Sequence, residues 1–444
     1  MSKKKPKPLP ASPVEAEIAS LTREGRGLTR VNGKPVLVHG ALPGEKVRLR
    51  YTRIRKDQDE GVAVEVLRAS PLRVQPRCAH ADICGGCSLQ HMDPAGQIRW
   101  KQGILEEVLE GVGNVRPERW LPPLVAGHWG YRRKARLGVR YVAKKGRTLV
   151  GFRERGTSYV ADLRRCEILH PVVGEKIEAI GALLDELSIR ERVPQIEMAM
   201  GEGPCVLVFR VLDPPSLEDL ARLVAFGERE GLRIYLQEGG PETVRPLPGQ
   251  EVDLRYSLPS AEVRIHFEPT DFTQVNLELD RRMVDQALAL LDPQPDERML
   301  DLFCGLGNFT LPLARWAADV LGVDGDEGLI ERARANASRN AIGNVRFLAA
   351  DLAGDSSSAP WTRERFHKVL LDPPRSGAMQ VLERLAGMEA ERILYVSCLP
   401  ETLARDAGRL VSELGYRLVA AGAMDMFPHT AHLEAMALFE RARA

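Results

Sequence analysis

The chain of 444 residues lacks any uninterrupted apolar run of the ~18 residues that a membrane-spanning helix needs, so we expect no membrane partner. Its basic start, Met1 to Lys7, has no apolar segment behind it, and we expect no secretory signal. Cysteine is also scarce: seven residues, an odd number, argue against a disulfide framework and favour a reducing, cytoplasmic location. The thiols then remain available for metal binding or catalysis.

Positive and negative side chains nearly balance over the whole chain, with a formal net charge of only +1. The distribution is nevertheless uneven. Residues 131–165 hold twelve Lys and Arg against Glu154 and Asp162, and residues 45–56 hold six against Glu45. Such blocks indicate either a solvated face or a binding site for a polyanion such as nucleic acid, and charge alone leaves both readings open.

The pattern divides the chain into a tail and three domains. Residues 1–13 are rich in Lys and Pro and are expected to be disordered. Residues 14–70 alternate short strands with Gly and Asn turns, and Asn32-Gly33 between apolar runs is a strong hairpin signal. This predicts a small β-barrel of the OB type. Residues 71–270 mix strands with helices at 97–111 and 174–187, which predicts a central α+β domain.

Residues 271–444 alternate strand and helix. The expected elements are strands at 299–303, 319–323, 345–348, 369–371 and 393–396, with helices at 309–318, 327–340, 381–387 and 401–414. Two closing strands, 416–421 and 435–439, have no helix between them and must be antiparallel. A parallel α/β sheet that ends in this way is the Rossmann-like architecture of class I methyltransferases.

Three signals in this domain point to a nucleoside cofactor. The run from Asp301 to Phe309 follows a strand, opens a helix and contains Gly-x-Gly, but lacks the third glycine of the pyrophosphate fingerprint. This favours S-adenosylmethionine over NAD. Asp324 ends the second strand, where an acid can accept two ribose hydroxyls, and Asp351 follows the third, where it can bind the adenine amine. Any one of these acids alone could simply cap a helix.

Two later strand ends carry groups suited to chemistry on a pyrimidine. The fourth strand ends in Asp372-Pro-Pro-Arg375 and the fifth in Ser397-Cys398. A thiolate that adds to C6 of uracil makes C5 nucleophilic, and a base must then remove the C5 proton. We assign Cys398 as the nucleophile and Glu434, at the mouth of the final strand, as the base. The alternative for Cys398 is an inert, buried thiol.

Four motifs occur in order along the chain: Asp301–Phe309, the Asp372 turn, Ser397-Cys398-Leu399-Pro400 and Phe427-Pro-His-Thr-x-His-x-Glu434. Together they resemble the RNA uridine-5-methyltransferase family, and within it the iron–sulfur enzymes that act on 23S ribosomal RNA. The resemblance implies Cys398 as nucleophile, Glu434 as proton acceptor and a monomer that methylates uridine. It also implies donor or base contacts from Gln274, Phe303, Asn308, Asp324, Asp351 and Asp372.

The chain departs from the family pattern at two positions, Asp324 where glutamate is frequent and Leu399 where asparagine is frequent. The shorter acid lengthens the expected ribose contact, and the leucine removes a contact to the base. The barrel resembles the RNA-binding TRAM domain of the same enzymes. Alternatives are the same chemistry on transfer RNA, cytosine-5 methylation, and an RNA-binding or ribosome-assembly module without catalysis. RNA cytosine enzymes usually carry a cysteine where this chain has Arg375.

The remaining cysteines divide unequally. Cys78, Cys84 and Cys87 form a close triplet, and Cys166 follows after a long gap. Four thiolates suit zinc or an iron–sulfur cluster, and a triplet with one distant cysteine is closer to the ferredoxin pattern. The resemblance implies a [4Fe-4S] cluster on these four residues. Our hypothesis is that the cluster holds the basic segment 131–165 against the barrel.

Overall fold

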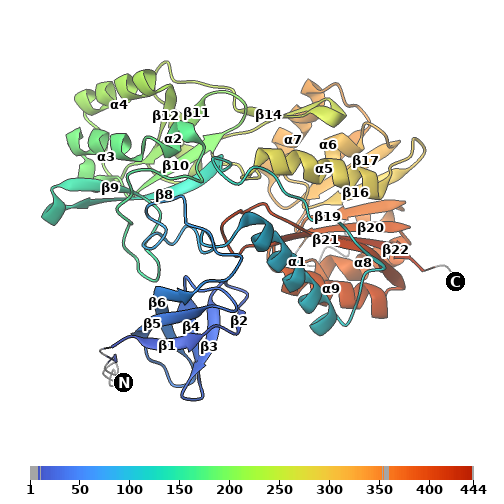
Figure 1. Cartoon of the computed structure of the whole chain (residues 1–444). Coiled ribbons are helices and arrows are strands. Elements are labelled where there is room, and N and C mark those ends of the chain that lie inside the picture. The colour runs from blue at the N-terminus through green and yellow to red at the C-terminus, as the bar shows by residue number, and fades with distance from the viewer. Residues whose placement is uncertain (1–8, 11, 353, 355–359, 443–444) are drawn as a thin grey trace, which may run out of the picture.

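The computed structural model describes residues 9–10, 12–352, 354 and 360–442 (Figure 1). The first sheet lies at one end of the molecule, the central unit and the C-terminal unit lie side by side beyond it, and a long helix lies between the first sheet and the C-terminal unit. Most of the expected disordered tail at 1–13 falls outside the described residues. No helix among the described residues is long and apolar enough to cross a membrane.

The first sheet closes on itself. Its order is β1-β5-β6-β4-β3-β2, and the edge strands β1 and β2 are almost continuous in the chain. Valines and leucines of the inward faces fill a small core, including Val36, Val47 and Leu49. The Asn32-Gly33 hairpin is confirmed, with φ of 51° and 80°, as a type I′ turn requires. The bounds are β1 (Val14–Glu17), β2 (Ser20–Leu21), β3 (Gly27–Val31), β4 (Lys34–His39), β5 (Lys46–Arg53) and β6 (Asp59–Arg68).

Residues 69–93 contain no helix or strand and lead to α1 (Pro94–Gly111). We call them the cysteine segment, because they hold Cys78, Cys84 and Cys87. Asp93 caps this helix through the N–H of Gly96, and Pro94 is its first residue, an arrangement that suits a helix start. The helix packs against α9 and β21 of the C-terminal unit (Figure 1). The sequence did not indicate which unit it joins, and the structure assigns it to the sheet that carries Cys398.

The central unit is a six-stranded sheet in the order β13-β12-β11-β10-β8-β9. Its helices α3 and α4 pack on the sheet, and their apolar faces bury Ile180, Leu184, Leu223 and Phe226 against it. The bounds are β8 (Lys134–Val142), β9 (Arg147–Gly151), α2 (Pro171–Gly174), α3 (Ile177–Glu186), β10 (Gln195–Met200), β11 (Cys205–Arg210), α4 (Leu217–Glu230), β12 (Leu232–Gln237) and β13 (Arg245–Pro246). A hairpin of β14 (Arg255–Leu258) and β15 (Val263–His266) follows. Short 3-10 turns occupy Ala143–Lys145, Arg190–Arg192, Pro241–Thr243, Pro259–Ala261 and Pro360–Arg363.

The C-terminal unit is an eight-stranded sheet in the order β18-β17-β16-β19-β20-β22-β21-β7. The first five strands of this order are parallel, and β22 is antiparallel to both β20 and β21, as predicted. The bounds are β7 (Arg119–Trp120), α5 (Leu277–Leu291), β16 (Arg298–Leu302), α6 (Thr310–Leu313), β17 (Asp319–Asp324), α7 (Glu327–Arg339), β18 (Val345–Ala349), β19 (Lys368–Leu371), α8 (Met379–Met388), β20 (Arg392–Ser397), α9 (Pro400–Ser412), β21 (Tyr416–Met424) and β22 (Glu434–Arg441).

The helix expected at 309–318 was wrong in length, because α6 covers only Thr310–Leu313. The turn that follows closes with shorter-range bonds, such as Arg315 N–H to the Pro312 carbonyl. The carbonyls of Ala314 and Ala317 accept from the Asn344 side chain instead of from helical N–H groups. The side chain therefore takes over acceptors that a longer helix would need.

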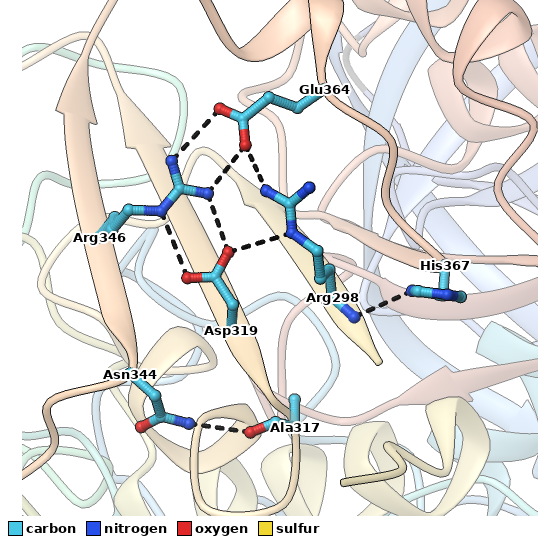
Figure 2. A network of polar contacts seen from close by, with 7 residues as sticks. All are labelled: Arg298, Ala317, Asp319, Asn344, Arg346, Glu364 and His367. Carbon is cyan, nitrogen blue, oxygen red and sulfur yellow. Dashed lines mark hydrogen bonds and ion pairs between the residues drawn. The ribbon is translucent and has the colours of Figure 1, made fainter. Parts of the chain in front are cut away.

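A network of charges ties the amino ends of three neighbouring strands together (Figure 2). Arg346 of β18 pairs with Asp319 of β17 at 2.8 Å and with Glu364 at 2.9 Å, and Arg298 of β16 bonds to both acids. Because the network lies at the amino edge of the parallel strands, the opposite edge remains for ligands.

Candidate active site

The loop after β16 keeps its backbone accessible at the carboxyl edge of the sheet. Phe303, Gly305 and Gly307 have φ of 66°, 52° and 90°, in the left-handed region that favours glycine. A Cβ added to Gly305 would meet no atom within 4 Å. The N–H groups of Phe303 and Cys304 donate to the Val323 carbonyl at 2.8 and 3.1 Å, which fixes the loop to β17. The loop is rigid and has room beside it for a ligand.

The two acids expected to bind adenosine lie at neighbouring strand ends. Asp324 ends β17, and its two carboxylate oxygens accept the N–H groups of Gly305 and Asp326, each at 3.0 Å. Asp351 follows β18 and accepts the N–H of Gly354 at 3.1 Å. Since each carboxylate oxygen can accept more than one bond, Asp324 is oriented by the loop and still able to receive hydroxyl groups.

A buried polar chain behind the loop includes a carboxyl that the sequence analysis missed. The Tyr256 hydroxyl donates to Asn308 Oδ1 at 2.8 Å, and Asn308 Nδ2 donates to Asp280 Oδ1 at 2.9 Å. Burial raises the pKa of Asp280 to about 7, and burial together with Asp280 raises the pKa of Asp372 to about 7. The signal was present in the helix pattern, because Asp280 shares the buried face of α5 with apolar residues three and seven positions later.

Gln274 lies half-buried in the segment that leads from β15 to α5, close in sequence to this carboxyl. The next polar residue, Asn276, is buried and caps α5 through the N–H of Leu279 at 3.3 Å. Of the residues expected to bind the donor, Asn308 lies in the loop itself and bonds to Asp280, whose charge in turn raises the pKa of Asp372.

Cys398 and Glu434 come together through strand register. In the antiparallel pair β20–β22, Ser397 lies opposite Ala435. Cys398 is the first residue after β20, and Glu434 is the first residue of β22, so both lie at the same end of this strand pair. The Glu434 carboxyl raises the pKa of the Cys398 thiol, so the two groups lie near each other.

Cys398 is half-buried and lines a cavity of about 570 Å³ with Arg375 and the 430–433 segment. Segments from every part of the chain meet here: Arg23 and Glu24 of the first sheet, Gly85 and Gly86 of the cysteine segment, and Arg132 of the central unit also line the cavity. A pocket built in this way can enclose a single nucleotide while its neighbours remain outside.

Neighbouring acidic and basic side chains shift the pKa values of Cys398 and Glu434 in opposite directions. Burial raises the pKa of the Cys398 thiol, Glu434 and Asp372 raise it further, and Arg375 lowers it. Burial and Asp372 raise the pKa of Glu434 to about 8, while Arg375 and Lys101 lower it. Near pH 8 both forms of the Glu434 carboxyl are populated, which is the condition a general base needs.

The four remaining cysteines of the expected ligand set line one small cavity. All four, Cys78, Cys84, Cys87 and Cys166, are free thiols, and Gly86 N–H points to Cys84 Sγ at 3.3 Å. Burial raises the pKa of Cys166 to about 11, so that a bound cation is needed to ionise this thiol at neutral pH. Among the described residues, no three His, Cys, Asp or Glu side chains are arranged to hold a single metal ion.

The cysteine segment is joined to the basic segment 131–165 by backbone and side-chain bonds. Gly85 N–H donates to the Arg153 carbonyl and Arg155 N–H to the Ile83 carbonyl, both at 2.9 Å. The Arg155 guanidinium also reaches the carbonyls of Ala81 and Cys87, at 2.8 and 3.2 Å. The two segments are therefore a single packed unit.

The strand order, the antiparallel strand β22 and the ligand loop after β16 define a class I methyltransferase fold. A family model described as tRNA (Uracil-5-)-methyltransferase matches residues 250–442. The chain is 54% identical over 438 residues to a 23S rRNA (uracil(1939)-C(5))-methyltransferase RlmD of Methylococcus capsulatus, which covers 98% of this chain and 99% of the relative. It is 53% identical to the protein of the same name from Alkalilimnicola ehrlichii, with 98% of each covered.

The chain belongs to the RNA uracil-5-methyltransferase family. Among solved structures, it is similar to the tRNA (uracil-54, C5)-methyltransferase of Pyrococcus abyssi in complex with S-adenosyl-L-homocysteine. The TM-score is 0.74 at 26% identity, and the match covers 96% of this chain and 99% of that one. The similarity extends over all three parts of the molecule.

Proposed function

We propose that this protein transfers a methyl group from S-adenosylmethionine to C5 of a uridine in 23S ribosomal RNA, at the position that its relatives' names give as 1939. The observation that carries the proposal is a pocket large enough for one nucleotide that Cys398 lines, with Glu434 directly after the lining segment 430–433 and near enough to raise the pKa of the Cys398 thiol. Over 50% identity across nearly the whole chain favours ribosomal over transfer RNA.

The reaction follows from these two side chains. The Cys398 thiolate adds to C6 of the flipped uracil, and the electron pair of the C5–C6 double bond moves to C5. Bound S-adenosylmethionine would supply an electrophilic methyl group to C5, with the S–CH3 bond breaking and S-adenosylhomocysteine as the leaving group. Glu434 then takes the proton from C5, and the double bond re-forms as the Cys398–C6 bond breaks. The thiolate is regenerated, and the carboxyl loses its proton to solvent.

The remaining expected site residues would hold the donor and the base. Asp324 would accept the ribose hydroxyls and Asp351 would face the adenine, while the backbone at Phe303 and Gly305 would line the nucleoside. Gln274 and the buried carboxyls near Asn308 suit the amino acid end of the donor, because a carboxylate attracts its ammonium group.

RNA binding is supported by a groove on the central unit. It encloses about 910 Å³ and is lined by basic side chains with an aromatic beside them: Arg136, Arg140, Lys145, Arg153 and Tyr159. Tyr159 is 71% exposed, which suits stacking on an unpaired base, and the cations suit phosphates. The closed N-terminal sheet would act as the TRAM-type RNA module, and Arg23 links it to Glu107 of α1 and Glu401 of α9, each at 3.1 Å.

The first test is the identity of the product. Purified protein, labelled donor and unmodified 23S RNA should yield one 5-methyluridine, mapped by mass spectrometry of nuclease fragments. Transfer RNA from cells without uridine-5-methylation serves as the competing substrate. Methyl incorporation into transfer RNA alone would show that transfer RNA is the substrate. Incorporation into neither RNA would favour an RNA-binding module without catalysis. Methylcytidine as product would make the protein a cytosine enzyme.

A [4Fe-4S] cluster on Cys78, Cys84, Cys87 and Cys166 forms part of the proposal. The four thiols line one small cavity. A close triplet with one distant cysteine is nearer to the spacing of ferredoxin-type clusters than to the paired spacing of zinc sites, and this favours a cluster over zinc. Methyl transfer moves no net electrons, and we assign the cluster to holding the basic segment 131–165, through the cysteine segment, against the barrel.

Replacing Cys84 by alanine should therefore reduce RNA affinity, because the basic segment loses its anchor at Gly85 and Arg155. S-adenosylmethionine binding should be unchanged, since the donor loop lies in another unit. Iron content, RNA binding and donor binding would be measured on the same preparation, with Cys205→Ala, a buried core cysteine of β11, as the control. Normal RNA affinity in an iron-free Cys84→Ala protein contradicts the anchoring role.

A further inference from the structure

One face of α1 carries polar side chains that have no contact with water. Gln97 and Lys101 lie one helical turn apart, and both are 0% exposed. A fully buried lysine is rare unless it is paired, because burial disfavours its charged form. These two residues therefore need partners inside the protein, and the segment between β21 and β22 provides them.

The partners of Lys101 lie in the segment Asp425–Leu433, which we call the base loop because it ends at Glu434. Lys101 Nζ donates to Asp425 Oδ1 at 2.6 Å and to the Phe427 carbonyl at 3.1 Å. Asp425 is 1% exposed on its side chain, so that the pair is isolated from solvent. Lys101 thus fixes the first half of the base loop.

Gln97 and its neighbours fix the middle of the same loop. The Gln97 side-chain Oε1 accepts the His429 backbone N–H at 2.8 Å, and Gln97 Nε2 lies 3.1 Å from His429 Nδ1. The N–H groups of Ser88 and Leu89 donate to the His429 carbonyl at 2.9 and 3.0 Å, and the Tyr131 hydroxyl donates to the Pro428 carbonyl at 3.0 Å. His429 has φ of 66°, a strained value for this residue type that the surrounding bonds maintain.

We propose that Lys101 is a positioning residue for the proton-removal step: paired with Asp425, it holds the base loop in place and supplies a positive charge near Glu434. The proposal rests on the proposed function, because it assigns Lys101 to the base of that reaction. No motif of the catalytic domain contains this lysine. It lies in α1, more than 300 positions before Glu434 in the sequence.

The charges near Glu434 show why the lysine matters. Groups from every neighbouring element belong to this set: Asp372 and Arg375 after β19, Cys398 after β20, Lys101 of α1, and Asp425, His429 and His432 of the base loop. Burial and Asp372 raise the pKa of Glu434, whereas Arg375 and Lys101 lower it. Arg375 borders the substrate pocket, whereas Lys101 is fully buried and bonds to Asp425 of the base loop.

The test is the pH dependence of one step, the release of RNA from the covalent adduct. In a single-turnover experiment the adduct appears as a shifted band in denaturing electrophoresis, and its decay reports removal of the C5 proton. The decay rate should rise with pH as Glu434 ionises, with a midpoint near its pKa of about 8. In Lys101→Met the midpoint should lie higher by on the order of one unit, so that decay below the midpoint is about tenfold slower. Donor binding and adduct formation should remain at the parent level.

Lys368→Met is the matched control. Lys368 is also buried and also donates to one carboxylate, Glu297 at 2.6 Å, and to one carbonyl, Asp292 at 2.6 Å. It begins β19 at the amino edge of the sheet, away from the reaction. Both variants lose a buried ion pair and should lose similar stability in thermal unfolding, but only Lys101→Met should shift the pH midpoint. An equal shift in both, or in neither, overturns the proposal.

If Lys101→Met does not fold, Lys101→Gln is measured instead, because an amide removes the charge and can still donate to Asp425 and Phe427. The same shift is expected, and a parent-like profile in this variant refutes the role. Failure of the proposed function is distinguishable, because the unaltered protein would then form neither adduct nor methylated RNA. With an active parent, an unchanged profile discards only the assignment of Lys101.

Discussion

Replacing Cys398 by alanine should reduce methyl transfer to RNA by about 10⁴-fold or more, the scale seen when an enzyme loses its nucleophile. Without the thiolate, C5 of uracil is too weak a nucleophile to attack a methyl donor at neutral pH. Donor binding should be retained, because the loop after β16 and the acids at Asp324 and Asp351 do not depend on this side chain. Incorporation of labelled methyl groups, together with calorimetric titration of the donor, measures both quantities.

Cys205→Ala is the control for this variant, since Cys205 is a buried thiol of the central sheet. It should methylate at nearly the parent rate. Methylation by Cys398→Ala at more than a small fraction of the parent rate would show that another group attacks C6, and the covalent mechanism proposed for this pocket would have to be abandoned.

Replacing Glu434 by glutamine should stop the reaction one step later. The amide cannot take the C5 proton, so that the methylated base stays bonded to Cys398 and the protein accumulates as a covalent complex with RNA. The carboxyl of Glu434 is near enough to Cys398 to raise the pKa of its thiol, which is why we expect this residue to act on the adduct. Denaturing electrophoresis should show a shifted band that persists for hours, where the parent shows a transient one.

The control lies on the same strand. Glu440 lies near the far end of β22. It pairs with Arg392 at the start of β20 and with Arg417 near the start of β21. Glu440→Gln should weaken the strand slightly, by the ~0–1 kcal/mol of an exposed ion pair, and leave adduct turnover unchanged. A stable band in Glu440→Gln, or normal release from Glu434→Gln, would move the base to another residue.

The C-terminal sheet was predictable because its signals are local. Strand and helix alternate with clear periodicity, and the absence of a helix between the last two strands determines that they are antiparallel. The Asn32-Gly33 hairpin turn could also be predicted from the sequence, because few residue pairs adopt the two successive left-handed conformations that such a turn requires. Strand β7 was missed because two residues, Arg119 and Trp120, carry no periodicity.

The structure also shows what local patterns do not reveal. Lys101 and Asp280 both lie on the buried faces of helices, and although the helix pattern places Asp280 on such a face, it does not show which group either residue contacts. Their partners, Asp425 and Asn308, are 324 and 28 positions away. Only the folded structure shows that these groups are in contact, because contacts between distant segments produce no periodic pattern in the sequence.

The insertion of β22 between β20 and β21 has a consequence for how the protein matures. Cys398 and the donor loop belong to strands made earlier in synthesis, whereas the carboxyl that completes the reaction arrives with the last strand of the sheet. A shift of one residue in that pairing would turn Glu434 to the other face. An unfinished or misregistered chain would therefore hold Cys398 without the carboxyl that we propose as its base, and methyl transfer would begin only once the final strand has paired in register.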